Sequence, residues 1–571
     1  MSSGPAPASP LAKLETPLRR LPVFRADVLV IGSGAGGLST ALTAASKGAH
    51  VMVLAKGSLR DTNTQEAQGG IAAAVGAHDD PELHAADTLR LGYGLAEADV
   101  VAELTSAAPA AMDWLTEAGM AFDRKPDGSL MLGREGGHRA ARILHSGGAA
   151  TGKELQRVLV ALVRQHARVD LFEEVMAIDL LKDAEGVVTG VLALARGAGS
   201  ASAEPVVFEA EAVVLATGGG GQIFRETTNP HLATGDGLAM ALRAGAELRD
   251  LEFVQFHPTI LYLAGAARWL ISEVIRGAGA VLRDRGGRAF MADFHQDRDL
   301  APRDVVSRAI FRRMVEAGDT HVHLDLSAVE RPAQRFPVLA RFAAGFGIDI
   351  NRDPVPVRPA VHYMVGGIRV DLDGRTSLPG LYAVGECSST GLHGANRMGS
   401  NSLLEGLVHG RMIGERLLDR PRRVRRFLDP APGRASQGHG HARLHLADMT
   451  YSLKSLMWRQ VGIERDAAGL DDAVERLDTW AGYLTRLGPF SPEGVEVMNM
   501  VQVAQVIARM ARFREESRGA HYRRDFPATE AAWQCHSLAR LTGEGLRLDR
   551  QPVADPYPQQ AMGAEAGGPT D

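Results

Sequence analysis

Short runs of consecutive apolar residues alternate with segments of helical character along the first part of the chain. Residues 28–31, 50–55 and 212–216 are such runs, which predict strands buried on both faces. Residues 38–46 follow the first run as a predicted helix, and another helix is predicted to begin at Thr151. Strands that alternate with helices in this way are typical of an α/β fold with a Rossmann-like domain.

A glycine-rich turn joins the first predicted strand to the first predicted helix. Gly32, Gly34 and Gly37 have the G-x-G-x-x-G spacing. In a dinucleotide-binding turn, one glycine makes the tight turn, one lets the backbone approach a pyrophosphate, and one lets the helix pack on the strand. The N–H groups at the helix start then meet the phosphates. The spacing alone also fits an ordinary turn, but strand, turn, helix and second strand together predict dinucleotide binding.

Two charged residues and a polar loop are candidates for further cofactor contacts. Lys56 follows the second predicted strand, where an acid often binds the ribose. Because a lysine cannot accept a hydrogen bond, either the ribose contact differs from the usual one or Lys56 is solvated. Asp236 opens a predicted helix between two glycines, as an N-cap or facing a cofactor's hydroxyls. Residues 62–71 end in two glycines and can lay their backbone against a flat ring system.

The middle of the chain carries basic and histidine side chains. Residues 133–145 form a loop dense in Arg, His and Glu, which is either solvated or suited to an anionic substrate with one cationic group. His257 ends a strand-like run, and His362 lies in an apolar setting that is more typical of a core histidine. Pro302 places Arg303 beside a helix N-terminus, where a cation is disfavoured. A residue held against its local preference is a candidate for function.

The remaining pattern predicts helices, a hairpin and irregular segments. Helical spacing is found at residues 80–118, 447–511 and 529–541, and a hairpin is predicted around residues 186–190. Residues 429–441 lack periodicity and are typical of a linker. The two ends of the chain have the composition of disordered tails.

Composition narrows the class of protein. With 571 residues, 45% of them hydrophobic, the chain can bury a large core, and its net charge of −5 does not indicate nucleic acid or an anionic membrane as a partner. Cys387 and Cys535 are too few for a disulfide framework or a cysteine-rich metal site, and no metal is predicted. No apolar run resembles a membrane span or a signal peptide. We therefore expect a soluble, cytoplasmic protein without a membrane partner.

Several short motifs occur in an order that resembles the flavoprotein family of fumarate reductase, succinate dehydrogenase and L-aspartate oxidase. They are the Gly32 turn and residues 66–71, 216–219, 255–259, 300–304, 384–386 and 396–403. The resemblance extends from about residue 27 to residue 527. It implies an FAD-binding domain at residues 22–250 and 364–428, an inserted α+β capping domain at 251–363, a linker at 429–446 and a helical C-terminal domain at 447–550, with tails at 1–21 and 551–571.

Two positions are similar to L-aspartate oxidases rather than to the other members of the family. Glu135 stands where dehydrogenase-type members are expected to have an uncharged residue. Asn63 stands where membrane-complex members carry a flavin-linked histidine, so the resemblance implies that FAD is held non-covalently. Residues 516–527 resemble a region that the whole family shares. Arg139 and Ala149 depart from the family pattern, in which a serine and an aspartate are expected.

The resemblance implies roles for the site residues. The implied catalytic and substrate-binding residues are Arg303, Glu135, His257, His362, Arg397 and Thr259. His257, His362 and Arg397 are expected to hold substrate carboxylates, with an added hydroxyl donor from Thr259. Glu135 is expected to face the substrate ammonium. Arg303 matches the proton-transfer residue of the family, although a guanidinium is a poor base and is better understood as an acid in fumarate reduction.

The FAD contacts that the resemblance implies come from six parts of the chain. They are Gly32, Ser33, Gly34, Ala35, Gly36, Gly37, Lys56, Asn63, Thr64, Gln68, Gly69, Gly70, Asp236, Glu386, Ser402 and Leu403. The amides of Ser402 and Leu403, at a predicted helix start, are expected to face the electron-rich edge of the flavin ring.

The implied reaction is the FAD-dependent oxidation of L-aspartate to iminoaspartate. Oxygen, which gives hydrogen peroxide, or fumarate is the expected electron acceptor. The reaction is the first step of de novo NAD biosynthesis through quinolinate, with a quinolinate-forming enzyme as a candidate partner. The alternatives are a soluble fumarate reductase or succinate dehydrogenase flavoprotein, an FAD-binding subunit without turnover of its own, and an oxidase for another amino acid.

Overall fold

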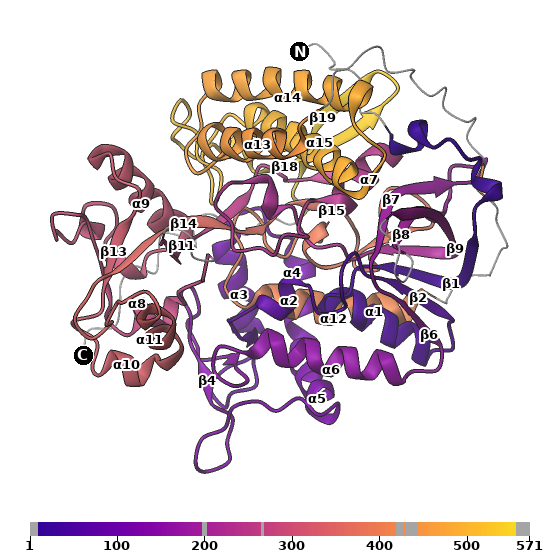
Figure 1. The fold of residues 1–571 in the computed structure, drawn as a ribbon. Coiled ribbons are helices and arrows are strands. Elements are labelled where there is room, and N and C mark those ends of the chain that lie inside the picture. The colour runs from indigo at the N-terminus through magenta and orange to yellow at the C-terminus, as the bar shows by residue number, and fades with distance from the viewer. Residues whose placement is uncertain (1–8, 197–201, 264–267, 418–426, 429–443, 555–571) are drawn as a thin grey trace.

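The computed structural model describes residues 9–196, 202–263, 268–417, 427–428 and 444–554 (Figure 1). A large body surrounds a central sheet, a smaller lobe lies on one side, and a group of C-terminal helices covers another side. The smaller lobe, which we call the cap, contains residues 254–364 and therefore interrupts the large body in sequence.

A seven-stranded sheet forms the centre of the large body. β1 (Val23–Ile31) lies between β2 (Val51–Leu54) and β9 (Ala203–Leu215) and is parallel to both. The predicted apolar runs at 28–31 and 212–215 are buried in these strands. The other strands of the sheet are β6 (Val169–Phe172), β7 (Val175–Lys182), β8 (Val188–Arg196) and β16 (Leu381–Ala383). The α/β, Rossmann-like fold predicted from the sequence is confirmed.

Two helices from distant parts of the chain lie side by side on this sheet. α1 (Ala35–Ser46) precedes the cap in sequence and α12 (Asn401–Arg416) follows it. They approach closely because α12 has glycines at the contact: a side chain at Gly410 would come within 2.6 Å of the Gly36 carbonyl oxygen. The other helices of this body are α2 (Asn63–Glu66), α3 (Pro81–Leu91), α4 (Ala98–Ser106), α5 (Ala108–Glu117), α6 (Thr151–Gln165) and α7 (Asp236–Ala244).

A small sheet places two polar loops next to each other. β5 (Ile143–Leu144) pairs with both β3 (Ile71–Ala72) and β4 (Leu132–Gly133). The loop at 62–71 and the loop at 133–145 are therefore held together, although they are far apart in sequence.

The cap is an antiparallel sheet with its own apolar core. β11 (Val254–Leu261) pairs with β14 (Val355–Met364), and β14 pairs with β13 (Val322–Asp325), which pairs with β12 (Val281–Arg283). The helices of the cap are α8 (Glu273–Gly277), α9 (Arg303–Ala317), α10 (Pro332–Arg335) and α11 (Pro337–Ala344). α9 packs along β11, where Ser307 donates a hydrogen bond to the Phe256 carbonyl oxygen.

The C-terminal region begins with three helices, α13 (Leu446–Gln460), α14 (Ala467–Leu487) and α15 (Pro492–Phe513). The helix predicted at 529–541 is wrong: this segment contains β18 (Cys535–Thr542), which forms a hairpin with β19 (Gly545–Pro552). β18 also pairs with β10 (Leu248–Arg249), and this pairing outweighs the local helical spacing. The same sheet contains β15 (Gly367–Arg369) and β17 (Ser388–Ser389).

The ends of the chain differ in part from the predicted tails. Short 3₁₀ helices at Pro10–Lys13 and Leu18–Arg20 replace disorder, because Leu14 and Leu18 are buried against β7, β8 and β9. β19 extends the ordered chain beyond residue 551, and Val553 is buried. Residues 1–8 and 555–571 and most of the predicted linker, residues 429–443, lie outside the described residues. Across the described ranges, no helix has both the length and the apolar character needed to cross a membrane.

Candidate functional site

A cavity of about 360 Å³ lies where the carboxyl ends of β1 and β2 meet the cap. Its wall includes every residue that the sequence predicts to contact FAD, from Gly32 to Leu403. It also includes every predicted substrate contact except Thr259. The hydroxyl of Thr259 instead donates to the Ile271 carbonyl oxygen, at 2.9 Å, within the cap.

The glycine turn at one end of the cavity has no room for side chains. Gly32 has a φ of +117°, and a Cβ there would lie 2.0 Å from the Ala216 carbonyl oxygen. A Cβ on Gly37 would lie 2.2 Å from the Gly32 carbonyl oxygen. The turn therefore brings bare backbone and the N-terminus of α1 to the cavity, which suits a pyrophosphate.

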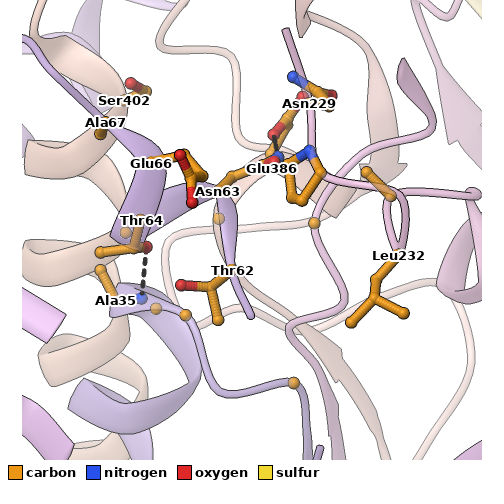
Figure 2. A pocket seen from close by; sticks show the side chains of 18 of the residues that line it. Ala35, Thr62, Asn63, Thr64, Glu66, Ala67, Asn229, Leu232, Glu386 and Ser402 are labelled. Carbon is orange, nitrogen blue, oxygen red and sulfur yellow. Dashed lines mark hydrogen bonds between the residues drawn. The ribbon is translucent and has the colours of Figure 1, made fainter. Parts of the chain in front are cut away.

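The polar loop at 62–71 forms the next part of the wall (Figure 2). The Thr64 hydroxyl accepts a hydrogen bond from the Ala35 amide at 3.0 Å, and Asn63 donates to Glu386 at 2.8 Å. These bonds join the loop to α1 and to the segment after β16. Burial raises the pKa of Glu386.

Two buried amide oxygens without a hydrogen-bond partner among the described residues lie along the same wall. They are Asn63 Oδ1 and Asn229 Oδ1. Buried polar atoms are normally satisfied, so their position indicates a ligand with polar groups of its own. A glycine cradle, helix N-termini and these unpaired oxygens together fit FAD.

The N-terminus of α12 faces the cavity. Ser400 caps the helix with a φ of +61°, and Ser402 and Leu403 lie in the first turn. The Ser402 hydroxyl accepts a hydrogen bond from Arg397 Nη1 at 3.0 Å. The positive end of α12 and the Arg397 side chain therefore meet at one place, which favours an electron-rich group.

Two arginines from different parts of the fold converge at the cap end of the cavity. Arg303, the first residue of α9, and Arg397, which precedes α12, both donate to Gln255 Oε1. Burial and the charge of Arg303 lower the pKa of Arg397 to about 10. The face of the Tyr363 ring lies 4.7 Å from the Arg397 guanidinium carbon and supports it.

A carboxylate that the sequence analysis missed holds Arg303. Glu273, at the start of α8, accepts from Arg303 Nε at 2.7 Å and from Arg276 Nη2 at 3.2 Å. Burial acts to raise the pKa of Glu273, but the two arginines outweigh it and hold this pKa below its usual value. The only local signal is Ser272 as an N-cap with an acid and a base three residues apart.

Two neutral histidines complete the cap side of the site. The rings of His257 and His362 lie 5.4 Å apart, edge to face. Burial lowers the pKa of both well below 6.5, and nearby arginines lower it further. The Thr259 amide donates to His257 Nδ1 at 3.3 Å, so the neutral ring carries its proton on Nε2.

Glu135 lies on the loop between β4 and β5, close to the cap: a Cβ on the neighbouring Gly136 would lie 3.2 Å from Glu273 Oε2. Glu135 Oε2 accepts a hydrogen bond from the Ser400 hydroxyl at 3.0 Å, and Glu135 lines the cavity. Arg142 anchors the same loop by ion pairs of 2.7 Å to both Asp79 and Asp87. Arg139, which departs from the family pattern, pairs with Asp87 as well. The departure therefore adds a contact at the base of the loop rather than a group in the cavity.

Comparison with known proteins agrees with this description. The family model described as "FAD binding domain" matches residues 27–403, and the one described as "Fumarate reductase flavoprotein C-term" matches residues 450–561. The chain is 42% identical to the L-aspartate oxidase of Streptomyces coelicolor, over 95% of this chain and 96% of that protein. It is 40% identical to the L-aspartate oxidase of Bacillus subtilis, over 91% of this chain and 95% of that protein.

Solved structures of related flavoproteins have the same fold. A point mutant of the quinol fumarate reductase FrdA of E. coli is 31% identical with a TM-score of 0.83, over 93% of this chain and 97% of that one. Sdh1 of Mycobacterium smegmatis is 33% identical with a TM-score of 0.83, over 96% of this chain and 97% of that one.

Proposed function

The chain belongs to the L-aspartate oxidases, FAD-dependent oxidoreductases with the fumarate reductase fold, and we propose how its cavity oxidises L-aspartate to iminoaspartate. One observation carries the proposal. Arg303, Arg397 and Glu135 line the end of a cavity whose other end is a dinucleotide-binding turn. This arrangement offers two cations and one anion to a substrate with two carboxylates and one ammonium.

The substrate carboxylates are held on the cap side. Arg397 donates charge-assisted hydrogen bonds to one of them, and such bonds are about twice as strong as neutral ones. His257 adds a donor from Nε2, because its Nδ1 already accepts from the Thr259 amide. His362 is the second neutral donor. Thr259 therefore acts through His257, because its hydroxyl donates to the Ile271 carbonyl oxygen within the cap.

Glu135, which lines the same end of the cavity, holds the substrate ammonium. A carboxylate there stabilises an amino acid, whereas it repels a dicarboxylate that lacks an amine. With two guanidinium groups for the carboxylates and Glu135 for the ammonium, the Cα–H bond of L-aspartate is fixed in one orientation. Such alignment lowers a barrier by up to about 7–11 kcal/mol.

A chain of charged groups leads from the reacting carbon into the cap. Arg303 faces the cavity, Glu273 binds Arg303, and Arg276 binds Glu273. Through this chain a proton moves between the substrate and the cap when fumarate is the electron acceptor. During aspartate oxidation the same groups keep Arg303 in place and balance the charge of the bound substrate.

FAD supplies the redox chemistry, taking two electrons from the substrate and passing them to the acceptor. The cavity wall from Gly32 to Gly70, with Glu386, Ser402 and Leu403, holds it without a covalent bond, since Asn63 has no imidazole. We propose oxygen or fumarate as the acceptor. The product then serves NAD biosynthesis, where a quinolinate-forming enzyme is the candidate partner.

Fumarate reduction is the second candidate activity. Solved relatives with this fold include a quinol fumarate reductase, and the cap end of the cavity has cations for a dicarboxylate. Glu135 argues against fumarate reduction as the main activity. Its carboxylate is negatively charged, and fumarate has no positively charged group to pair with it.

The experiment follows the colour of the flavin. Holoenzyme is mixed without oxygen with L-aspartate or with succinate, and the flavin absorbance is recorded. Rapid bleaching by L-aspartate but not by succinate is expected, and added oxygen or fumarate restores the colour. Bleaching by succinate alone would favour the dehydrogenase, and no bleaching by either substrate would leave FAD binding without turnover.

A further inference from the structure

Helix α15 of the C-terminal region reaches the wall of the cavity at the end of β2. Glu496 Oε1 lies 2.5 Å from Lys56 Nζ, and Asn499 Nδ2 donates to Asp236 Oδ1 at 2.7 Å. Lys56 and Asp236 line the cavity, whereas Glu496 and Asn499 lie behind them. Residues of the C-terminal region are therefore in contact with the cofactor wall, far in sequence from the glycine turn.

Lys56 has no N–H group to spare for a ligand. An ammonium has three donors, and Asp236, Thr234 and Glu496 accept them at 2.8, 2.8 and 2.5 Å. Burial acts to lower the pKa of Lys56, but the two carboxylates outweigh it and raise this pKa above its usual value. Lys56 is thus a fixed charge that orients its partners rather than a donor to the ribose.

Asp236 keeps one acceptor position open. A carboxylate has about four lone-pair positions. Lys56 and the Thr234 hydroxyl donate to Oδ2, and Asn499 donates to Oδ1. One position remains, in a residue that lines the cavity. Asp236, the first residue of α7, thus lies beside the position after β2 where other dinucleotide-binding units have an acid.

The amide of Asn499 is itself fixed. Arg243, in α7, donates from Nη1 to Asn499 Oδ1 at 2.7 Å and binds Asp179 Oδ1 through Nε at 3.1 Å. Because the oxygen of Asn499 faces Arg243, its NH₂ group faces Asp236. The orientation of the carboxylate therefore depends on contacts between α7 and α15.

We propose that Glu496 and Asn499 are positioning residues of the FAD site, which hold Lys56 and Asp236 so that Asp236 accepts a hydrogen bond from a ribose hydroxyl of the cofactor. The C-terminal region is then part of the cofactor site. The inference rests on the proposed FAD-dependent function, but it concerns cofactor binding alone.

The test measures FAD affinity without substrate. Apoprotein of the wild type, Asn499→Leu and Glu496→Gln is titrated with FAD, and the quenching of flavin fluorescence gives Kd. We expect Kd to rise about tenfold for Asn499→Leu, as for one lost hydrogen bond, and about threefold or more for Glu496→Gln. Circular dichroism of each apoprotein establishes that it is folded at the temperature used.

Two control variants on α15 separate positioning from general loosening. Glu493→Gln changes an acid in the first turn of the same helix, away from the cavity wall, and is expected to leave Kd unchanged. Gln505→Ala removes the 2.7 Å bond to Asp478 in α14, and is expected to lower Tm without changing Kd. The proposal is overturned if Asn499→Leu binds FAD like the wild type, or if Gln505→Ala raises Kd as much. Flavin bleaching at saturating FAD tests the reaction separately, so the two failures are distinguishable.

Discussion

Arg303 and Arg397 donate to the same atom, Gln255 Oε1, at 3.1 Å for Arg303 Nη1 and Arg397 Nη2. Arg303 comes from the cap and Arg397 from the large body, so one neutral oxygen joins the two parts at the reacting end of the cavity. The charge of Arg303 lowers the pKa of Arg397, so the two guanidinium groups repel each other, and a bound dicarboxylate would offset this repulsion. The amide of Gln255 fixes their spacing.

Replacing Gln255 by Leu should weaken this arrangement. Without the shared acceptor the two guanidinium groups move apart, and we expect KM for L-aspartate to rise about tenfold and kcat to fall by a similar factor. Steady-state kinetics measures both. Gln255→Glu is the matched comparison: it keeps the acceptor but neutralises one positive charge, so KM should rise with a smaller loss of kcat. A Gln255→Leu enzyme with wild-type constants would contradict the assigned spacing role.

Glu273→Gln should slow turnover more than it weakens substrate binding. The change removes the charge that binds Arg303 and Arg276, and we expect fumarate reduction to slow about 10²-fold, in the range typical of lost proton transfer. The rate is measured by oxidation of reduced flavin with fumarate. Glu316→Gln, an exposed change near the end of α9, is the control and should have no effect. Equal losses in the two variants would point to a general defect of the cap.

Glu135→Gln should change which substrate the cavity prefers. Loss of the carboxylate removes the partner of the substrate ammonium, so we expect KM for L-aspartate to rise about 10- to 100-fold, as for a lost charged hydrogen bond. Fumarate reduction should be retained or improved. Both activities are measured on the same preparation, and a parallel loss of both would contradict the assignment.

Gly32→Ala should yield a protein without flavin. The added Cβ would lie 2.0 Å from the Ala216 carbonyl oxygen, at a φ of +117°, so the turn must shift. The flavin-to-protein absorbance ratio after purification measures the loss. Gly48→Ala is the matched control, because Gly48 has a φ of +100° but open space around its Cβ position. It should cost about 1 kcal/mol of stability and keep its flavin.

Acid should destabilise the protein below about pH 6.5 through buried histidines. Burial lowers the pKa of His84 and of His138 to about 4. As pH falls, these histidines are therefore protonated in the unfolded state at a higher pH than in the folded state. Stability is therefore fully present above pH ~6.5 and is lost as pH falls toward 4, by up to about 1.4 kcal/mol per pH unit for each histidine. Urea unfolding at pH values of about 7, 6 and 5 measures the slope.

His84→Gln isolates one histidine in this experiment. The amide can still donate to Asn401, whose Oδ1 lies 2.9 Å from His84 Nε2 in the wild type. We expect the slope of the unfolding free energy against pH to fall by the contribution of about one proton. An unchanged slope would show that His84 does not titrate on unfolding.

Local patterns predicted much of the fold and of the cofactor wall. The glycine turn and the start of α12 could be predicted from the sequence, because the spacing of a few neighbouring residues determines them. The segment 529–541 was not, because its strand depends on pairing with β10, which lies far earlier in the chain. Helix propensity predicts secondary structure poorly where strand pairing between distant segments determines it.

The residues of the substrate end were predicted through resemblance, and the structure adds Glu273 to them. His257, Arg303 and Arg397 stand in recognisable motifs. His362 lies outside those motifs, and Glu273 lies in a short helix with no distinctive spacing. Glu273 acquires its partner only when α8 and α9 fold against each other. Thr259 stands in a motif, but its strand turns the hydroxyl toward Ile271. A motif identifies residues, and the backbone decides which of them reach the cavity.

The pairing of β16 with β9, and the packing of α12 on α1, have a consequence for biosynthesis. The glycine turn leaves the ribosome long before α12, and Asn499 follows later still. A nascent chain therefore has a nucleotide-binding turn but no complete pocket until most of the polypeptide has been made. Such long-range contacts slow folding. FAD therefore binds late in the folding of a new chain. Before that, the chain is free of flavin, and the residues before and after the cap that form the pocket have yet to pack together.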